Sequence, residues 1–286
     1  MLKKMQENSP QEKGSKVLPL TFRNNMQFFV FRHFEATGLV VHGFTTRNGG
    51  VGSDPYGSLN TAFHVGDDPE NVRANRLNAC KALAINPGAL VAGKQVHGDN
   101  VAVVDGKDMG KGALSYVDAL PDTDALVTGT REAPLSSYYA DCVPIFLLDP
   151  VRKVVALAHA GWKGTVLKIG KKTVNRMRQA FGTDPAKCLA GIGPSIGPCC
   201  YEVDDRVIVP LRQEFPCFSD FIEARSPGRW RLNLWEANRR TLLEAGLLPA
   251  NIETASICTC CHPETFFSYR AQNGTTGRMA ALLMLK

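Results

Sequence analysis

Hydrophobic side chains recur at helical spacing in several stretches of the chain, and the residues at the ends of these stretches are typical of helix boundaries. Asp68 is a suitable N-cap and Pro69 follows it in the first turn. Gly182 and Gly246 each follow an amphipathic stretch, as glycine does at helix C-termini. Pro210 interrupts one further stretch. The pattern therefore predicts helices over residues 69–84, 165–181, 205–215 and 234–245.

Shorter runs of β-branched and aromatic residues, several of them bounded by Gly, Pro or Asp, predict strands. They cover residues 27–32, 39–45, 101–104, 125–128, 135–148, 154–159, 189–192 and 253–257. From Leu18 on, strand and helix segments alternate without a linker, a charge block or a repeat of fixed period. We therefore predict a single mixed-sheet α/β domain over residues 17–286. Residues 1–16 are polar and aperiodic, and we expect them to be a disordered tail.

Composition and charge narrow the classes of function. No apolar run among the 286 residues reaches the ~18 residues that a membrane span needs, and the N-terminal residues lack the apolar core of a signal peptide. We expect a cytoplasmic protein with no membrane partner, whose nine cysteines are reduced. The net charge of +6 comes from basic residues scattered among acidic ones, which argues against nucleic acid as a partner.

The segment from Tyr138 to Gly164 reads as two strands joined by a turn at Asp149–Arg152. If those four residues form the turn, Cys142 lies directly opposite His159, with Cβ atoms about 4.5 to 5.5 Å apart. A bulge at Pro144 would shift this register. The pair suits two ligands of one zinc ion, a Cys/His nucleophilic pair, or a thiol packed beside an imidazole.

A third candidate ligand is His97, which lies between two glycines in the segment Gly93–Gly98. Two histidines and one cysteine make an open three-ligand zinc site, in which a fourth position is left for water or substrate. Such an ion lowers the pKa of bound water to about 7. Asp141 is a candidate general base or a partner of the ligands, provided that the strand bulges and turns its side chain toward the site.

Several motifs occur in order along the chain: TTRNGG (residues 45–50), KQVHG (94–98), ADCVP (140–144), AHAGW (158–162), GIGPSIGPCCYEV (191–203), FSYR (267–270) and TGR (276–278). From about Val41 on, they resemble the family long labelled multicopper polyphenol oxidase or laccase-domain proteins. The same family is more recently described as purine nucleoside phosphorylases with adenosine deaminase activity. The resemblance implies an α/β fold like that of the cytotoxic necrotizing factor catalytic domain.

By the same resemblance, His97, Cys142 and His159 match the family's zinc ligands. The function implied is a zinc-dependent purine nucleoside phosphorylase of broad specificity (adenosine, inosine, guanosine, methylthioadenosine) that also deaminates adenosine. We expect one zinc per chain, with copper binding possible in vitro. A four-copper oxidase is excluded, because its copper centres need about ten histidines, typically in His-x-His pairs. This chain has six histidines and no such pair.

Phosphorolysis needs an anion site and a pocket for the purine. Arg47, Arg270 and Arg278 are candidates for phosphate, and Trp162 and Lys163 are candidates for base stacking and added charge. The run from Cys258 to His262 lacks a spaced second pair of zinc ligands. We therefore expect its cysteines to be reduced thiols at the pocket rim, with Cys199 and Cys200 unassigned.

The same residues are compatible with two other functions. A metal-free cysteine hydrolase or amidase would use Cys142 as nucleophile and His159 as base. A binding protein would hold purines without turnover, although motif residues clustered on loops argue against this function.

Overall fold

The computed structural model describes residues 18–286, so the predicted tail at 1–16 lies outside the described residues. The fold is mixed α/β, as expected, and its strands pair into three sheets. The first sheet has six strands in the order β1 (Leu20–Arg23), β2 (Met26–Phe29), β3 (Val40–Thr45), β15 (Met279–Leu285), β7 (Leu135–Tyr139) and β4 (Val91–Ala92). β15 runs antiparallel to both β3 and β7, so the strand latest in the chain lies in the middle of this sheet.

The second sheet is mixed as well. Its six strands have the order β14 (Ile252–Thr254), β10 (Leu189–Ile192), β8 (Val143–Asp149), β9 (Val154–Ala160), β6 (Ala125–Thr128) and β5 (Val101–Val103). Every residue of β8 and β9 is buried, because both faces of these strands are covered. A small antiparallel sheet contains β11 (Glu202–Val203), β13 (Arg229–Leu232) and β12 (Ile222–Ser226).

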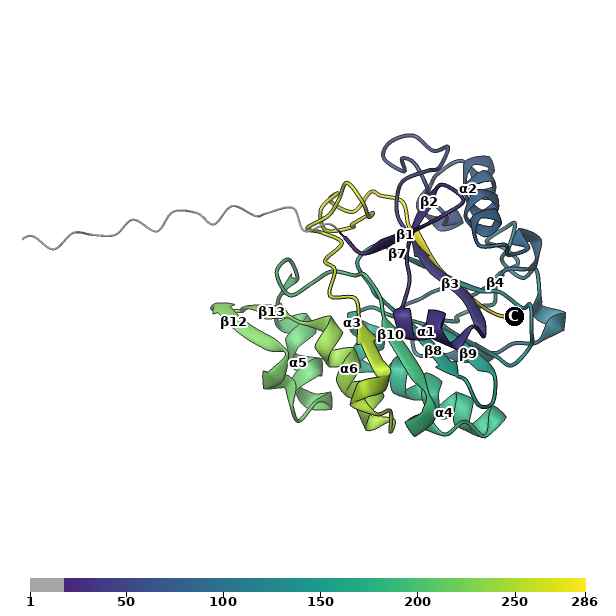
Figure 1. Cartoon of the computed structure of the whole chain (residues 1–286). Coiled ribbons are helices and arrows are strands. Elements are labelled where there is room, and N and C mark those ends of the chain that lie inside the picture. Colours follow the sequence, from purple (N-terminus) through teal and green to yellow (C-terminus); the bar gives the residue numbers. More distant parts are fainter. Residues whose placement is uncertain (1–17) are drawn as a thin grey trace, which may run out of the picture.

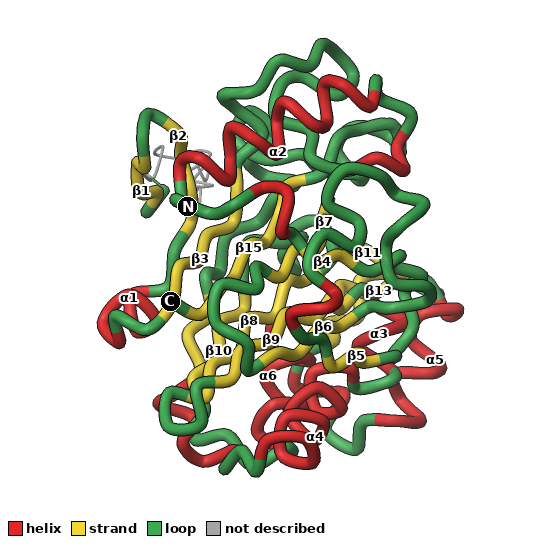
Figure 2. Tube along the Cα trace, turned by 90° about the vertical axis from the view of Figure 1, so that its right-hand side faces the viewer, coloured by secondary structure: helices red, strands yellow, loops and turns green. Residues whose placement is uncertain are grey.

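The two large sheets pack face to face, with helices on the outside (Figures 1 and 2). Aromatic and aliphatic side chains of both sheets fill the space between them, among them Phe44, Tyr139, Phe146, Leu157 and Leu283. The outer face of the second sheet is covered by α3 (Trp162–Val166), α4 (Ile169–Phe181), α5 (Asp205–Glu214) and α6 (Leu234–Glu244). α2 (Pro69–Ala82) covers the first sheet, and α1 (Arg32–Thr37) follows β2. The resemblance to the cytotoxic necrotizing factor domain stays a prediction.

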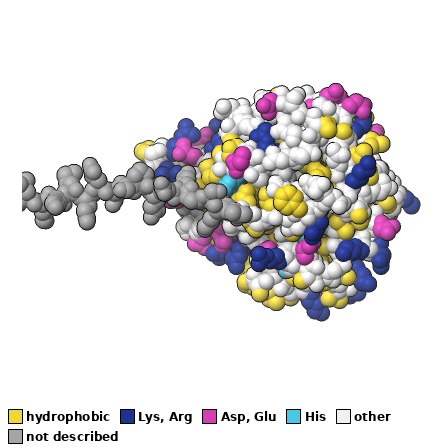
Figure 3. Space-filling view, turned by 45° about the horizontal axis from the view of Figure 1, so that its top comes forward, with side chains coloured by type: hydrophobic (Ala, Val, Ile, Leu, Met, Phe, Trp, Pro, Cys, Tyr) yellow, Lys and Arg dark blue, Asp and Glu magenta, His cyan; other side chains and the backbone are white. Residues whose placement is uncertain are grey.

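Short 3-10 turns complete the secondary structure at Phe63–Val65, Pro87–Ala89, Gly106–Asp108, Pro185–Lys187, Phe218–Asp220 and Pro249–Asn251. No helix within residues 18–286 is both long and apolar enough to cross a bilayer. On the face shown in Figure 3, Lys and Arg side chains are spread among Asp and Glu side chains.

The helix boundaries follow the local signals of the sequence. The side chain of Asp68 accepts a hydrogen bond from the Glu70 amide at 2.9 Å, as an N-cap does at the start of α2. The predicted helix over 165–181 is instead two helices, because Lys168 adopts a left-handed conformation (φ 56°) between α3 and α4. α5 and α6 match the predicted ranges to within a residue, and Pro210 lies inside α5.

The predicted strand over 135–148 is wrong in one important respect. The chain leaves the first sheet after Tyr139 and enters the second sheet at Val143, so the run forms two strands in different sheets. Asp141 lies at the break with φ 81°, a left-handed conformation that a continuous strand does not contain. The predicted strand at 27–32 likewise ends early, because α1 begins at Arg32.

Candidate metal centre and nucleoside pocket

The hairpin of β8 and β9 places His159 beside the break between the sheets. Its register pairs Asp149 with Val154 and Pro144 with His159, so the predicted pairing of Cys142 with His159 is wrong. The loop is longer than the predicted turn because Lys153 takes a left-handed conformation (φ 55°) and pairing resumes only at Val154.

The three predicted ligands nevertheless meet. Cys142 follows the left-handed Asp141 just before β8, His159 lies in β9, and His97 lies in the loop after β4 with φ 62°. Each offers one ligand atom, and these atoms lie within 4.8 Å of one another. The rings of His97 and His159 are 4.8 Å apart between centroids and pack edge to face. His159 is buried, whereas His97 is exposed, so the group opens to one side.

Asp124 organises this group, and sequence reasoning missed it. Its Oδ1 accepts hydrogen bonds from His159 Nδ1 at 2.8 Å and from the His97 amide at 3.0 Å. Its Oδ2 accepts from the amides of Val96 at 3.1 Å and Gly98 at 2.8 Å. One buried carboxylate therefore fixes the ring of one histidine and the backbone of the other. The available signal was an aspartate directly before the buried strand β6.

The charges of the group suit a metal. Burial alone raises the pKa of the Cys142 thiol, but the charges and hydrogen bonds of His159 and His97 outweigh burial and lower that pKa to about 6. Burial opposes the charging of His159, yet Cys142 and Asp124 raise its pKa to about 9. Zinc binding would release the proton of His159 and leave a thiolate and two imidazoles, one of them held through Nδ1 by a carboxylate. This donor set is one that zinc binds. These residues fit the implied ion.

A cavity of about 530 Å³ opens next to this group. Its size is typical of a small-molecule site. Several predicted site residues line it, namely His97, Asp141, Cys142, His159, Trp162, Arg270 and Arg278. Further lining residues belong to the quoted motifs, namely Gln95, Ala140, Gly161, Ile196, Tyr201 and Tyr269. His64 and Leu234 also line the cavity and lie outside those motifs.

Arg47 and Lys163 lie outside the lining of this cavity. The Arg47 guanidinium donates hydrogen bonds to the carbonyl oxygens of Gly57 (2.8 and 3.0 Å) and Pro263 (2.7 Å), and it stacks on the Phe267 ring. Its donors thus bind the protein backbone. Lys163 is exposed on α3, with its Nζ 5.7 Å from the centroid of the Trp162 ring.

Asp141 connects the cavity to two loops. Its Oδ1 accepts a hydrogen bond from the Thr259 hydroxyl and its Oδ2 accepts one from the Arg270 amide, each at 2.7 Å. Its carbonyl oxygen accepts from the Ile196 amide at 2.9 Å. The strand break thus does turn the Asp141 side chain toward the site, where it holds the segment that carries Arg270.

His64 is the clearest lining residue without a sequence signal. Desolvation, together with the cations of Arg278 and Arg76, lowers its pKa to about 4, so the imidazole is neutral near pH 7. A neutral imidazole can donate one hydrogen bond and accept another. The cavity therefore offers both kinds of polar partner beside the aromatic rings of Trp162, Tyr201 and Tyr269.

Comparisons with known proteins show the family of this chain. It belongs to the family described as multi-copper polyphenol oxidoreductase laccase, whose model matches residues 41–286. This match confirms the resemblance carried by the motifs. The chain is 40% identical over 248 residues to purine nucleoside phosphorylase YlmD of Bacillus subtilis, a match that covers 86% of this chain and 89% of the relative.

Two further matches agree with that result. Adenosine deaminase RL5, from an unknown prokaryotic organism, is 36% identical and matches 83% of this chain and 91% of its own length. The crystal structure of YlmD from Geobacillus stearothermophilus superposes with a TM-score of 0.84 at 41% identity, covering 86% of this chain and 92% of that one.

Proposed function

We propose that this chain is a zinc-dependent purine nucleoside phosphorylase of broad specificity that also deaminates adenosine. The observation that carries the proposal is the 40% identity to a purine nucleoside phosphorylase over 86% of this chain and 89% of the relative. The adenosine deaminase relative supports the second activity. In phosphorolysis, phosphate replaces the purine at C1′ and releases ribose 1-phosphate. In deamination, water replaces the amino group at C6 of adenosine and ammonia leaves.

His97, Cys142 and His159 would hold the zinc, and Asp124 would keep the His159 ring and the His97 backbone in place. Bound there, zinc would supply Lewis-acid chemistry beside the substrate. The family label names multicopper chemistry, but six histidines in the whole chain do not suffice for a blue copper and a trinuclear centre.

Phosphate binding, purine stacking and proton transfer are assigned to other residues that line the cavity. Arg278 and Arg270 line the cavity as cations and are assigned to the phosphate. Trp162 and the two tyrosines present aromatic faces on which a purine ring can stack. Asp141 is the one carboxylate among the described lining residues, so we assign it proton transfer beside the substrate.

The first test separates the reactions by their products. Zinc-loaded protein is incubated with adenosine with and without phosphate, and the products are resolved by chromatography. We expect adenine and ribose 1-phosphate only with phosphate, and inosine in both cases. Dialysis against a chelator should abolish both activities and added zinc should restore them. Intact adenosine from zinc-loaded protein would overturn the proposal, and an amidase activity that resists chelation would favour the cysteine hydrolase.

Arg278→Ala should raise the KM for phosphate about tenfold. The expected size follows from the loss of one charge-assisted hydrogen bond of about 1.5 kcal/mol. Nη1 of Arg278 is held by the carbonyl oxygens of Thr276 (2.7 Å) and Gly277 (2.9 Å), which orients the guanidinium in the cavity wall. Adenosine deamination uses no phosphate, so its rate should change little. Both rates are measured on the same preparation.

Arg47→Ala is the matched comparison. Because all three guanidinium nitrogens of Arg47 bind backbone carbonyls and Arg47 does not line the cavity, its loss should lower the melting temperature and leave the KM for phosphate unchanged. The opposite result, in which Arg47→Ala and not Arg278→Ala weakens phosphate use, would place the anion site at the TTRNGG motif.

A further inference from the structure

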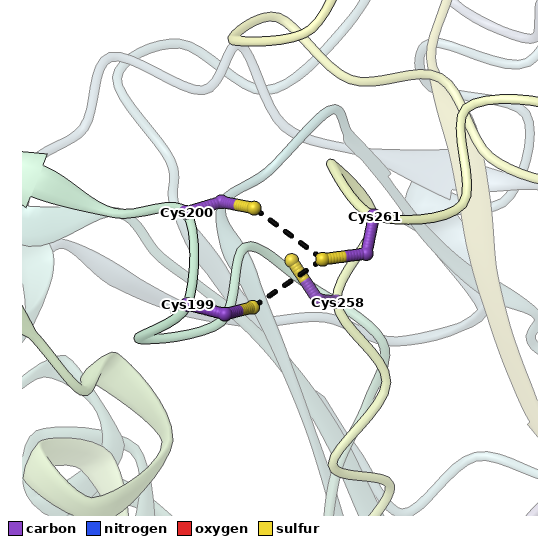
Figure 4. A group of neighbouring side chains, drawn as sticks. All are labelled: Cys199, Cys200, Cys258 and Cys261. Atoms are coloured by element: carbon purple, nitrogen blue, oxygen red, sulfur yellow. Dashed lines mark hydrogen bonds between the residues drawn. The ribbon is translucent and has the colours of Figure 1, made fainter. Parts of the chain in front are cut away.

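Four cysteines from two distant segments meet beside the nucleoside cavity (Figure 4). Cys199 and Cys200 lie in the loop between β10 and β11, and Cys258 and Cys261 lie in the segment after β14. Their four sulfur atoms lie within 4.8 Å of one another. The sulfur of Cys261 is 3.4 Å from those of both Cys199 and Cys200.

The backbone holds the two segments together around Cys258. Ser195 and Cys258 form an isolated parallel bridge. The Ser195 amide donates to the Ile257 carbonyl at 3.1 Å, and the Thr259 amide donates to the Ser195 carbonyl at 3.1 Å. The Gly197 amide donates to the sulfur of Cys258 at 3.2 Å. The buried Cys258 is therefore fixed by backbone contacts, and the exposed Cys199 and Cys261 lie around it.

We propose that Cys199, Cys200, Cys258 and Cys261 bind a second zinc ion, separate from the ion at His97, Cys142 and His159. Four sulfurs at the usual ~2.3 Å from one zinc are about 3.8 Å apart in a tetrahedron. The observed separations fit this arrangement. Four protein thiolates fill the coordination shell, so the site is closed and structural rather than catalytic. All-sulfur tetrahedral sites select zinc over harder cations.

The sequence showed half of this site. Cys258 and Cys261 have the Cys-x-x-Cys spacing of zinc ligands, but no second spaced pair follows in the sequence. The second pair is Cys199 and Cys200, which only the fold brings near. Cys260, which lies between Cys258 and Cys261 in the sequence, is outside the set of four. The site also changes the expected number of zinc ions from one per chain to two.

The second zinc would connect two walls of the nucleoside cavity. The carbonyl oxygens of Cys200 and Glu202 accept hydrogen bonds from Nη1 and Nη2 of Arg270, each at 3.1 Å. Tyr201, between them, lines the cavity, as does Arg270. An ion that joins the cysteine loops therefore fixes the carbonyls that orient Arg270, without touching the substrate.

The test counts zinc per chain by mass spectrometry of the metal in protein purified under reducing conditions from zinc-supplemented cells. We expect two ions in the wild type, one in His97→Ala/His159→Ala, one in Cys199→Ser/Cys261→Ser, and two in the control Cys260→Ser. X-ray absorption of the histidine variant should show zinc with sulfur ligands only. The cysteine variant should also melt at a lower temperature than the control.

The histidine variant keeps all four cysteines, so its zinc content decides the question even if the cysteine variant does not fold. Absence of zinc from the folded histidine variant, or a zinc shell there that contains nitrogen or oxygen, overturns the proposal. A disulfide within the four, seen as a loss of about 2 Da that peptide mapping assigns to these cysteines, would also overturn it. None of these readouts uses the enzymatic activity, so they are independent of the proposed phosphorylase function.

Discussion

Asp124→Asn should lower kcat/KM for adenosine phosphorolysis about 10²- to 10³-fold and reduce the zinc content. All four hydrogen bonds to this side chain are donated to it, two to each oxygen. An asparagine must place its NH₂ group where one of those oxygens stood. The NH₂ group is a donor, and it would then face the groups that donate to that oxygen, in a buried site. Loss of one outer partner of a metal ligand typically costs 10- to 100-fold, and Asp124 supports two ligands.

The measurement combines kinetics with zinc analysis on one preparation. Asp122→Asn is the matched control, because Asp122 is exposed two residues away and only its backbone carbonyl accepts a described side-chain hydrogen bond, from Asn100. A melting curve separates loss of the site from loss of the fold. If Asp124→Asn retains full zinc and activity within threefold of the wild type, then Asp124 does not position the two histidines.

Gly161→Ala should remove most of the activity, about 10²-fold, although its backbone tolerates alanine. Gly161 has φ −67° and ψ 178°, which any residue adopts. The space is the obstacle, because a Cβ there would lie 2.9 Å from the sulfur of Cys142 and 3.0 Å from Cδ2 of His97. Both ligands would have to move. Misplacing a reacting group by about 1 Å costs on the order of 10²-fold in rate.

Zinc affinity and kcat/KM are the quantities to measure for Gly161→Ala. Gly106→Ala is the control, because a Cβ at Gly106 meets no atom within 4 Å. We expect the control to match the wild type in both quantities. If Gly161→Ala binds zinc as tightly as the wild type, then His97 and Cys142 accommodate the methyl group and still bind the ion. That result would contradict the expected displacement of the two ligands.

The sequence was informative where the signals are local. α2, α5 and α6 were predicted because N-caps, terminal glycines and apolar periodicity lie within the helices themselves or next to them. β15 was missed, since its apolar residues show no alternation and its partners, β3 and β7, are far away in the chain. The break at Asp141 was missed because an apolar run does not reveal one left-handed residue.

The site residues, too, could be predicted only where the signal is local in the sequence. His97, Cys142 and His159 were selected because each lies in a distinctive motif, and the structure brings their ligand atoms together. Asp124 was not selected, because its role consists of hydrogen bonds to residues that only the fold brings near. Arg47 and Arg278 have similar glycine-containing neighbours in sequence. Only the tertiary structure shows that all three guanidinium nitrogens of Arg47 bind backbone carbonyls, whereas Arg278 lines the cavity and binds carbonyls through Nη1 alone among its described hydrogen bonds.

The central position of β15 has a consequence for biosynthesis. Synthesis proceeds from the N-terminus at ~5–20 residues per second, so β3 and β7 leave the ribosome before the strand that joins them. Until Met279–Leu285 emerges, both strands carry unpaired edges, which are sites for aggregation. β7 leads directly into Asp141 and Cys142, so we expect the candidate metal site to form only after that strand. We therefore expect a chain that stops before Met279 to aggregate or to be degraded, without partial activity.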